Sequence, residues 1–267
     1  MFTLDEIAYV QQALVDHCTS MRYRIAVLDP PLFSVPGESR ELQEIQSWRE
    51  RFDSSYAALY FPWVLVYDPL QLGGNPLRAI PPSGHVAGTY ANYDLTVGVH
   101  RAPANFELNW IQALLLDLGP VEQGVLNPAG INCLRVLRSR GIRVYGARTV
   151  SSSTLWTYVN VRRLMMMIEK AAEYSLQWAV FEPNDAQLRL KVSSALTVFL
   201  ESIFEAGGLS GATDKEAFFV KCDATNNTSD MADVGQFLAE VGVAPAIPAE
   251  FIVFRVGRTA DRLEVTE

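Results

Sequence analysis

Three consecutive serines, Ser151 to Ser153, are the residues whose type and setting most invite a catalytic interpretation. They follow the run "VYGART" and precede a helical pattern. A nucleophilic serine on a strand-to-helix turn needs a small glycine on each side, in the pattern GxSxG, and none flanks these serines. A phosphate loop needs the spacing GxxxxGK[ST], which is also missing. We therefore interpret the run as a helix cap, in which Ser153 or Thr154 accepts a hydrogen bond from a first-turn amide.

The histidines and cysteines could bind a metal by type, but their spacing does not favour it. There is no HExxH pattern and no CxxC pair, and an odd number of cysteines argues against a disulfide framework. We expect no cofactor, no metal site and no catalytic residue, and a reducing compartment. The six residues are His17, His85, His100, Cys18, Cys133 and Cys222.

Composition excludes several classes of partner. The 267 residues are 49% hydrophobic and 19% charged, which is ordinary for a folded protein. The net charge of -8 disfavours binding to nucleic acid phosphates. No apolar run approaches the roughly 20 residues that span a bilayer, and "MFTLDEIAYVQQ" lacks a signal-peptide pattern. We expect a soluble protein of the cytoplasm, without nucleic acid and without membrane insertion.

Helical and strand patterns alternate in the first part of the chain. Helical spacing over 5–18 leads to the apolar strand "RIAVLDPP", and helical spacing over 38–52 leads to "YAALYFPWVLVYDP", interrupted by Pro62. This alternation predicts an α/β (α+β) fold in which a sheet and helices form layers. Residues 71–105 show no sustained period and are predicted to form a long ordered loop within a core domain of residues 1–250.

The second part of the chain is predicted to contain two long helices and further strands. "GINCLRVLRSRGIRVYGART" predicts two short strands around Gly141, and a helix follows over 155–176. A second helix is expected from an N-cap at Asn184 to a stop at Gly207. "EAFFVKCD" and "AEFIVFRVGR" are predicted strands, and residues 251–267 are expected to form a C-terminal arm.

Several segments together resemble the tail sheath proteins of contractile phage tails and contractile injection systems. They occur in the family's order from about Tyr56 to Val256. The segments are "YAALYFPWVLVYDP", "PPSGHVAGTYANYD" leading to "GVHRAPAN", "LNPAGINCLRV", "GIRVYGART" continuing into "YVNVRRL", "FEPND", "AGGLSGATDKEAFFVKCD" and "VGVAPAIPAEFIVFRV".

The resemblance implies a structural protomer that stacks as six-subunit rings around an inner tube and shortens to drive the tube through an envelope. The implied partners are further copies of the chain, the inner tube protein, and baseplate and cap proteins, in a tail or tail-like particle assembled in the cytoplasm. Family members generally carry more chain ahead of "RIAVLDPP", including an N-terminal arm. Here a helix is predicted almost directly after Met1, so we expect a compact member, a fragment, or a chain whose arm-bearing segment is absent from this sequence.

The family also implies that an extended terminal strand adds to a neighbouring subunit's sheet. We assign this role to the alternating segment Phe251, Ile252, Val253, Phe254, Arg255 and Val256. Arg148, Arg162 and Arg163 are predicted to form a structural joint, in which the planar fork of Arg148 binds several carbonyls. Asp230, Asp233 and Glu240 are candidates for contact with the inner tube, and a solvated face is their alternative role.

Two other functions stay open at this stage. One is a baseplate or tail-terminator adaptor of the same machine, which forms one ring and does not elongate. The other belongs to a different class, an α/β hydrolase or nucleotide-binding enzyme built on the "RIAVLD" unit.

Overall fold

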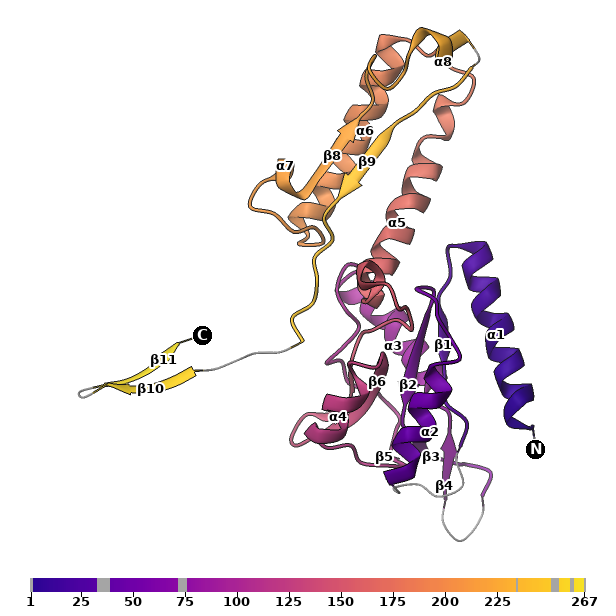
Figure 1. The fold of residues 1–267 in the computed structure, drawn as a ribbon, viewed down its shortest axis with the longest axis vertical. Helices are drawn as coiled ribbons and strands as arrows, with labels where there is room; N and C mark the ends of the chain where they lie inside the picture. The colour runs from indigo at the N-terminus through magenta and orange to yellow at the C-terminus, as the bar shows by residue number, and fades with distance from the viewer. Residues whose placement is uncertain are drawn as a thin grey trace.

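The central sheet has four strands in the order β1-β2-β6-β7. The computed structural model describes residues 2–32, 39–71, 76–233, 235–250, 255–259 and 262–266 (Figure 1). Three of the strands are parallel, and β7 is antiparallel to β6. The crossover from β1 to β2 carries a helix, as parallel neighbours require. The strands are β1 (Ala26–Leu28), β2 (Ala57–Phe61), β6 (Ile131–Leu137) and β7 (Gly141–Tyr145).

Strand β2 is buried on both faces of this sheet. Ala57, Leu59 and Phe61 join one core cluster, and Ala58 and Tyr60 join another. A continuous apolar run is what a strand covered on both faces needs, so the run in the sequence and the layered fold agree. The first face is covered by α1 (Leu4–Met21), α2 (Ser39–Arg49) and α4 (Pro120–Leu126).

The second face is covered by a helix that the sequence analysis did not predict. Residues 71–105 were expected to form a long loop, but they contain β4 (Leu77–Ile80) and α3 (Ser83–Thr96). Val86 and Tyr90 on α3 are buried against the sheet and form its apolar stripe. In the sequence, the surrounding glycines and polar residues obscure this stripe. Tertiary packing therefore overrides a weak local signal.

A smaller antiparallel sheet lies beside the first, in the order β4-β3-β5. Its central strand β3 (Val64–Tyr67) follows β2 after Pro62, which lacks a backbone donor and separates the two strands. Its third strand is β5 (Ala113–Leu114). The predicted strand region of residues 56–69 is thus divided between two sheets.

Helix α5 (Val159–Ser175) connects this body to an upper lobe (Figure 1). Val159, at its start, belongs to a core cluster of the body, and Ile168 packs in the lobe. The lobe contains α6 (Ala186–Glu205), α7 (Asp214–Ala217), β8 (Phe218–Lys221), α8 (Ser229–Asp233) and β9 (Glu240–Val243). The N-cap of α6 is Asp185, which accepts a hydrogen bond from the Leu188 amide, and not the predicted Asn184.

The chain ends in a hairpin of β10 (Arg255–Thr259) and β11 (Arg262–Thr266). The two strands pair antiparallel, with Arg255 opposite Thr266 and Val256 opposite Val265. Among the described strands, neither pairs with any strand outside the hairpin (Figure 1). One strand was predicted here, and the structure has two.

Candidate functional site

Arg148 lies directly after β7, and a buried amide fixes its backbone. Asn132 on β6 is fully buried. Its Oδ1 accepts from the Arg148 amide at 2.6 Å, and its Nδ2 donates to the Arg148 carbonyl at 2.7 Å and to the Leu59 carbonyl at 3.1 Å. The three bonds join β2, β6 and the segment that carries Arg148, so the guanidinium projects from a rigid backbone.

The Arg148 side chain binds Glu250. Its Nε lies 3.1 Å from both carboxylate oxygens, and its Nη2 lies 2.5 Å from Oε2. Both side chains are mostly buried, at 18% and 13% exposed. The hydrogen bonds that Arg148 donates to the Glu250 carboxylate raise the pKa of Arg148. Arg148 was predicted to bind several carbonyls, but among the described residues its main partner is a carboxylate, and the Pro128 carbonyl lies 3.5 Å from its Nη1.

Glu250 is the last residue of a segment that we call the arm root (residues 244–250). Asn127 also donates to Glu250, with its Nδ2 3.2 Å from Oε1. Higher in the segment, the Ala246 amide donates to the Gly208 carbonyl at 3.0 Å, and the Ala246 carbonyl accepts from Asn160 Nδ2 at 3.1 Å. The arm root is therefore fixed to the upper lobe, to α5 and to the body, just before residues 251–267 begin.

Arg162 is buried at 7% exposed and lies among aromatic rings. Its guanidinium carbon is 3.5 Å from the centre of the Trp156 ring and 4.3 Å from that of Tyr56. Nη2 donates to Ser55 Oγ at 2.6 Å and Nη1 to the Tyr56 hydroxyl at 3.3 Å. Burial lowers the pKa of Arg162, since water is replaced mainly by ring faces.

Arg163 pairs with the carboxylate of Asp94 on helix α3. Its Nη1 donates to Asp94 Oδ1 at 2.9 Å, and its Nη2 contacts the second oxygen of the same carboxylate. The guanidinium also lies over the Tyr90 ring at 4.7 Å. The three predicted joint residues therefore bind three separate places: Arg148 the arm root, Arg162 the segment before β2, and Arg163 helix α3.

The serine run does not form the predicted cap. Ser153 precedes a short 3-10 helix (Thr154–Trp156) and makes no side-chain capping bond. Ser152 instead binds Asp53, donating from its amide at 2.8 Å and from its hydroxyl at 2.6 Å. These bonds lower the pKa of Asp53. The run fixes a loop contact between residues 99 positions apart.

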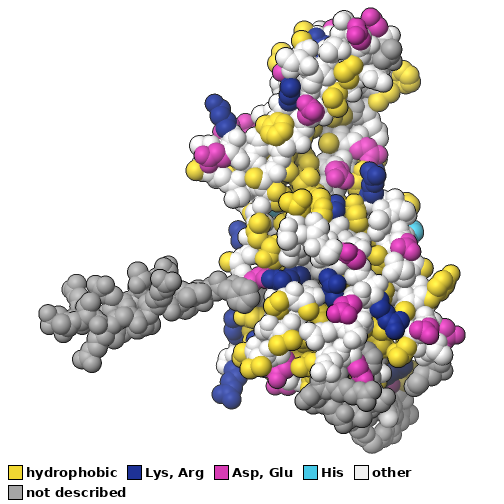
Figure 2. Space-filling view, viewed as in Figure 1, with side chains coloured by type: hydrophobic (Ala, Val, Ile, Leu, Met, Phe, Trp, Pro, Cys, Tyr) yellow, Lys and Arg dark blue, Asp and Glu magenta, His cyan; other side chains and the backbone are white. Residues whose placement is uncertain are grey.

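The predicted inner-tube residues are exposed on the upper lobe. Asp230 and Asp233 lie on α8, which Figure 1 places at the tip of the lobe, and Glu240 begins β9. Figure 2 shows acidic side chains gathered at this tip. Glu240 accepts a bond from Asn226 Nδ2 at 3.3 Å. Of the predicted inter-subunit strand, Phe251 to Phe254 lie outside the described residues, and Arg255 and Val256 lie in β10.

The other residues considered for chemistry are separate from one another. Within the described residues, no group of three or more His, Cys, Asp or Glu side chains is arranged to hold a metal ion. The three cysteines are free and buried, and burial raises the pKa of Cys133 to about 12. No helix in the part of the chain that the structure describes is long and apolar enough to span a membrane.

Sequence reasoning missed Glu250, Asn127 and Asn132. A signal was present, because all three lie in segments that carry the resemblance, "LNPAGINCLRV" and "VGVAPAIPAEFIVFRV". Their partners are more distant in sequence than local patterns reach.

Comparison with known proteins identifies the class to which this layered body with its protruding lobe belongs. The family described as "Phage tail sheath protein central domain" matches residues 3–150, and "Phage tail sheath C-terminal domain" matches residues 151–259. The chain therefore belongs to the phage tail sheath family.

Curated relatives agree with this assignment. The tail sheath protein of Salmonella phage ViI is 27% identical over 274 residues, which cover 100% of this chain and 42% of that protein. The tail sheath protein of Enterobacteria phage T4 is 24% identical over 282 residues, which cover 99% of this chain and 41% of that protein. The chain thus spans about two-fifths of the length of these relatives.

Solved structures of contractile systems share the fold. The anti-feeding prophage baseplate, symmetrised six-fold, contains a chain with a TM-score of 0.78 and 31% identity, over 94% of this chain and 65% of that one. The sheath complex of the PVC extracellular contractile injection system, in its contracted state, matches with a TM-score of 0.78 and 32% identity, over 89% of this chain and 64% of that one. The mixed α/β fold and the tail sheath family are confirmed.

Proposed function

We propose that this chain is a structural sheath subunit that polymerises as stacked hexameric rings around an inner tube, and that the sheath contracts to drive the tube through a target envelope. The observation that carries the proposal is the similarity to chains of solved sheath structures of contractile systems over 89% or more of this chain. One of those matches is to a helical sheath in its contracted state. Catalysis has no part in the proposal.

The C-terminal arm is the proposed link between subunits. In this proposal the arm, including residues 251–256, reaches a neighbouring copy and extends its sheet by main-chain pairing. Four to six added backbone bonds contribute about 1 kcal/mol each, so one arm contributes several kcal/mol. The fixed arm root supports the idea, because a tether needs an attachment that stays in place while the bodies rotate.

Contraction requires two packings of the same subunits that differ in free energy. We propose that the bodies and lobes move as rigid units and that the arms stay paired. In this arrangement α8 faces the inner tube through Asp230 and Asp233, with Glu240 nearby. The particle is assembled in the cytoplasm together with baseplate and cap proteins.

Electron microscopy of the purified chain with its tube partner tests the proposal. We expect hollow tubes of uniform width that pellet on ultracentrifugation. Particles that stay small and monodisperse under all polymerising conditions contradict it.

The similarity to a baseplate structure favours one second candidate, an adaptor of the same machine. An adaptor forms a single ring on the tube and does not elongate when more subunits are added. The same micrographs distinguish a sheath subunit from an adaptor. The deciding measurement is the length of the assembly along its axis, because both form rings but only a sheath elongates.

A further inference from the structure

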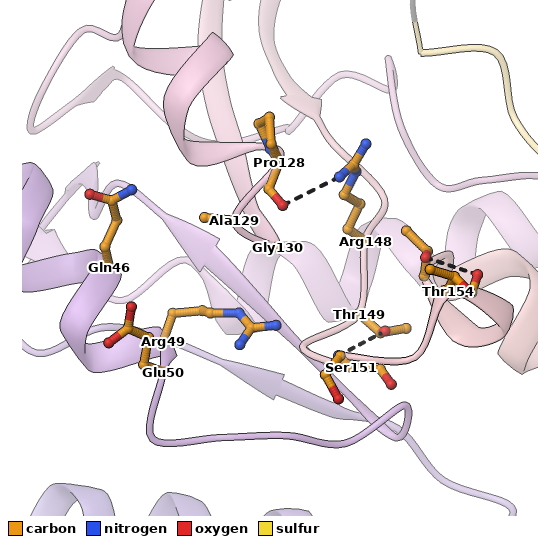
Figure 3. Close-up of a pocket in the computed structure, with 12 residues that line it drawn as sticks. Gln46, Arg49, Glu50, Pro128, Ala129, Gly130, Arg148, Thr149, Ser151 and Thr154 are labelled. Atoms are coloured by element: carbon orange, nitrogen blue, oxygen red, sulfur yellow. Dashed lines mark hydrogen bonds between the residues drawn. The ribbon is translucent and has the colours of Figure 1, made fainter.

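A hollow of about 420 Å³ opens between the end of α2, the turn at Gly130 and the segment after β7 (Figure 3). It is distinct from the Arg148 contact with the arm root, although Arg148 forms part of its wall. Most of the lining is polar, and hydroxyl groups are numerous. The hydroxyl-bearing residues are Thr149, Ser151, Ser152, Thr154 and Thr157.

Arg49 extends from the last turn of α2 into the middle of this hollow, as Figure 3 shows. Arg148 is also in the wall, but its Nη1 points to the Pro128 carbonyl and its charge is balanced by Glu250. Arg49 is therefore the cation that the hollow presents.

Within the described residues, Arg49 forms no close ion pair, and the carboxylates of Asp53 and Glu50 act on its charge from a longer distance. Its Nε is buried without a hydrogen-bond acceptor, and its Nη1 is 3.5 Å from the Phe52 carbonyl. In the described ranges no carboxylate lies within ion-pair distance of Arg49, and the nearby Asp53 is already bound by Ser152. Burial lowers the pKa of Arg49, which reflects a desolvated cation. Such a group gains more from a bound carboxylate than an exposed arginine does.

The backbone opposite Arg49 leaves room for the guanidinium. Gly130 has a φ of +81°, and a Cβ placed on it would lie 3.1 Å from Arg49 Nε and 3.1 Å from the Thr149 carbonyl oxygen. Any other residue at this position is strained by the positive φ, and its Cβ requires the close neighbours to shift by a few tenths of an ångström. The turn and the arginine thus form one built cavity.

We propose that this hollow receives the carboxylate of an acidic side chain from a second copy of the chain, which pairs with Arg49. The proposal rests on the proposed function as a sheath subunit. A guanidinium binds a carboxylate through two parallel hydrogen bonds. The hydroxyls of Thr149, Ser152 and Thr157 already donate to acceptors of this chain, which leaves those of Ser151 and Thr154 to donate to the remaining lone pairs.

The local charges favour a carboxylate over a phosphate. Glu50 lies at the rim and repels a doubly charged anion more strongly than a singly charged one. The chain itself has 30 acidic and 22 basic residues, so a second copy offers surplus carboxylates.

The first test uses the unassembled wild-type chain and Arg49→Gln. Replacing an arginine that stabilises the fold lowers the melting temperature of the protomer. Replacing a partly desolvated cation that has no close ion pair does not. We expect Arg49→Gln to keep or raise the melting temperature, and sodium acetate at 100 mM to raise that of the wild type alone by about 1–2 °C relative to sodium chloride. A lowered melting temperature for Arg49→Gln, or an equal acetate effect on both proteins, overturns the proposal.

The second test measures assembly with the tube partner. Arg49→Gln should raise the protein concentration for half-maximal assembly about tenfold or more, and Arg49→Lys less. Arg78→Gln, on the exposed side of β4, is the matched control and should assemble like the wild type. Normal assembly of Arg49→Gln overturns the proposal. If acetate raises the melting temperature only when Arg49 is present, and Arg49→Gln still assembles normally, the hollow binds a free anion and not a second copy. Failure of the wild type itself to assemble counts against the proposed function instead, and the acetate measurement still reports on Arg49.

Discussion

The Glu250 carboxylate receives Arg148 Nε at 3.1 Å on each oxygen and Nη2 at 2.5 Å on Oε2, across 102 positions of sequence. This contact joins the segment after β7 to the arm root. In the proposed assembly, this pair and Asn132 behind it are one of the connections between the arm and the sheet.

Arg148→Lys should weaken this connection. An ammonium group is a point donor and cannot replace the planar fork, so one or two of the bonds to Glu250 are lost. Because both side chains are mostly buried, we expect a loss of about 1–2 kcal/mol in the free energy of unfolding and faster amide exchange in the arm root. Urea denaturation and hydrogen exchange measured by mass spectrometry provide the two values.

The matched control is Arg51→Lys. Arg51 Nη1 lies 3.7 Å from an Asp5 oxygen, and the two side chains are 46% and 94% exposed. An exposed pair of this kind contributes little, so stability should change by less than about 0.5 kcal/mol. Sheaths that form normally from Arg148→Lys, with unchanged exchange in residues 244–250, contradict the assigned role.

Asn132→Ala should be more damaging than any change on the joint's surface. It removes three hydrogen bonds and leaves the Leu59 carbonyl and both backbone groups of Arg148 without these partners in the core. We expect a loss of about 2–3 kcal/mol, measured by urea denaturation. Asn92→Ala, on the exposed side of α3, is the control and should be nearly neutral. An equal effect of the two substitutions contradicts the role of Asn132.

The parts of the fold that the sequence predicts are those whose signal is local. Strand β2 is an unbroken apolar run, and α6 repeats apolar residues at Val192, Leu196 and Ile203, so each shows its burial within a few residues. Helix α3 fails this test. Its start is held by Asp29, whose Oδ1 accepts from the Ser83 amide at 2.8 Å across 54 positions.

The joint shows the same limit. The sequence predicts that Arg148 is structural, because its planar fork suits several acceptors, but it does not predict which acceptors. The serine run was assigned to a cap, through Ser153 or Thr154, because caps are local, and the structure instead shows Ser152 bound to Asp53. Contacts between distant segments depend on the packing of the whole fold, and one sequence alone does not specify them.

Stability should fall as pH rises from 4 to 7, through Asp29. Burial raises the pKa of Asp29 to about 6 from an ordinary 3.8, and the bond from Ser83 offsets part of this rise. A raised carboxyl pKa means that the folded state favours the protonated form. Its contribution is complete below the unfolded pKa and is lost as pH rises through about 6, and the total is about 3 kcal/mol.

Asp29→Asn removes this contribution and keeps an oxygen to accept from Ser83. We expect a gain of up to about 2–3 kcal/mol at pH 7.5 and no gain at pH 4, measured by urea denaturation at each pH. The half-buried histidines His85 and His100 have lowered pKa values and act in the opposite direction, so the difference between variant and wild type is the quantity to compare. Asp117→Asn, at an exposed position, serves as the control. If the free energy of unfolding of Asp29→Asn changes with pH in parallel with that of the wild type, the role of Asp29 is contradicted.

Removal of residues 251–267 should separate folding from assembly. The described strands of this segment pair with one another and with no other strand, and the contacts of Glu250 with Arg148 and Asn127 lie before the cut. A chain that ends at Glu250 should therefore keep its melting temperature within about 3 °C, a shift that corresponds to about 1 kcal/mol. It should form no tubes in negative-stain micrographs, because its copies lack the arm that is proposed to extend a neighbour's sheet.

If the shortened chain still elongates into tubes, the lattice is held by body contacts alone and the arm is not the link between subunits. If it forms single rings that do not stack, the arm joins rings along the axis rather than subunits within one ring.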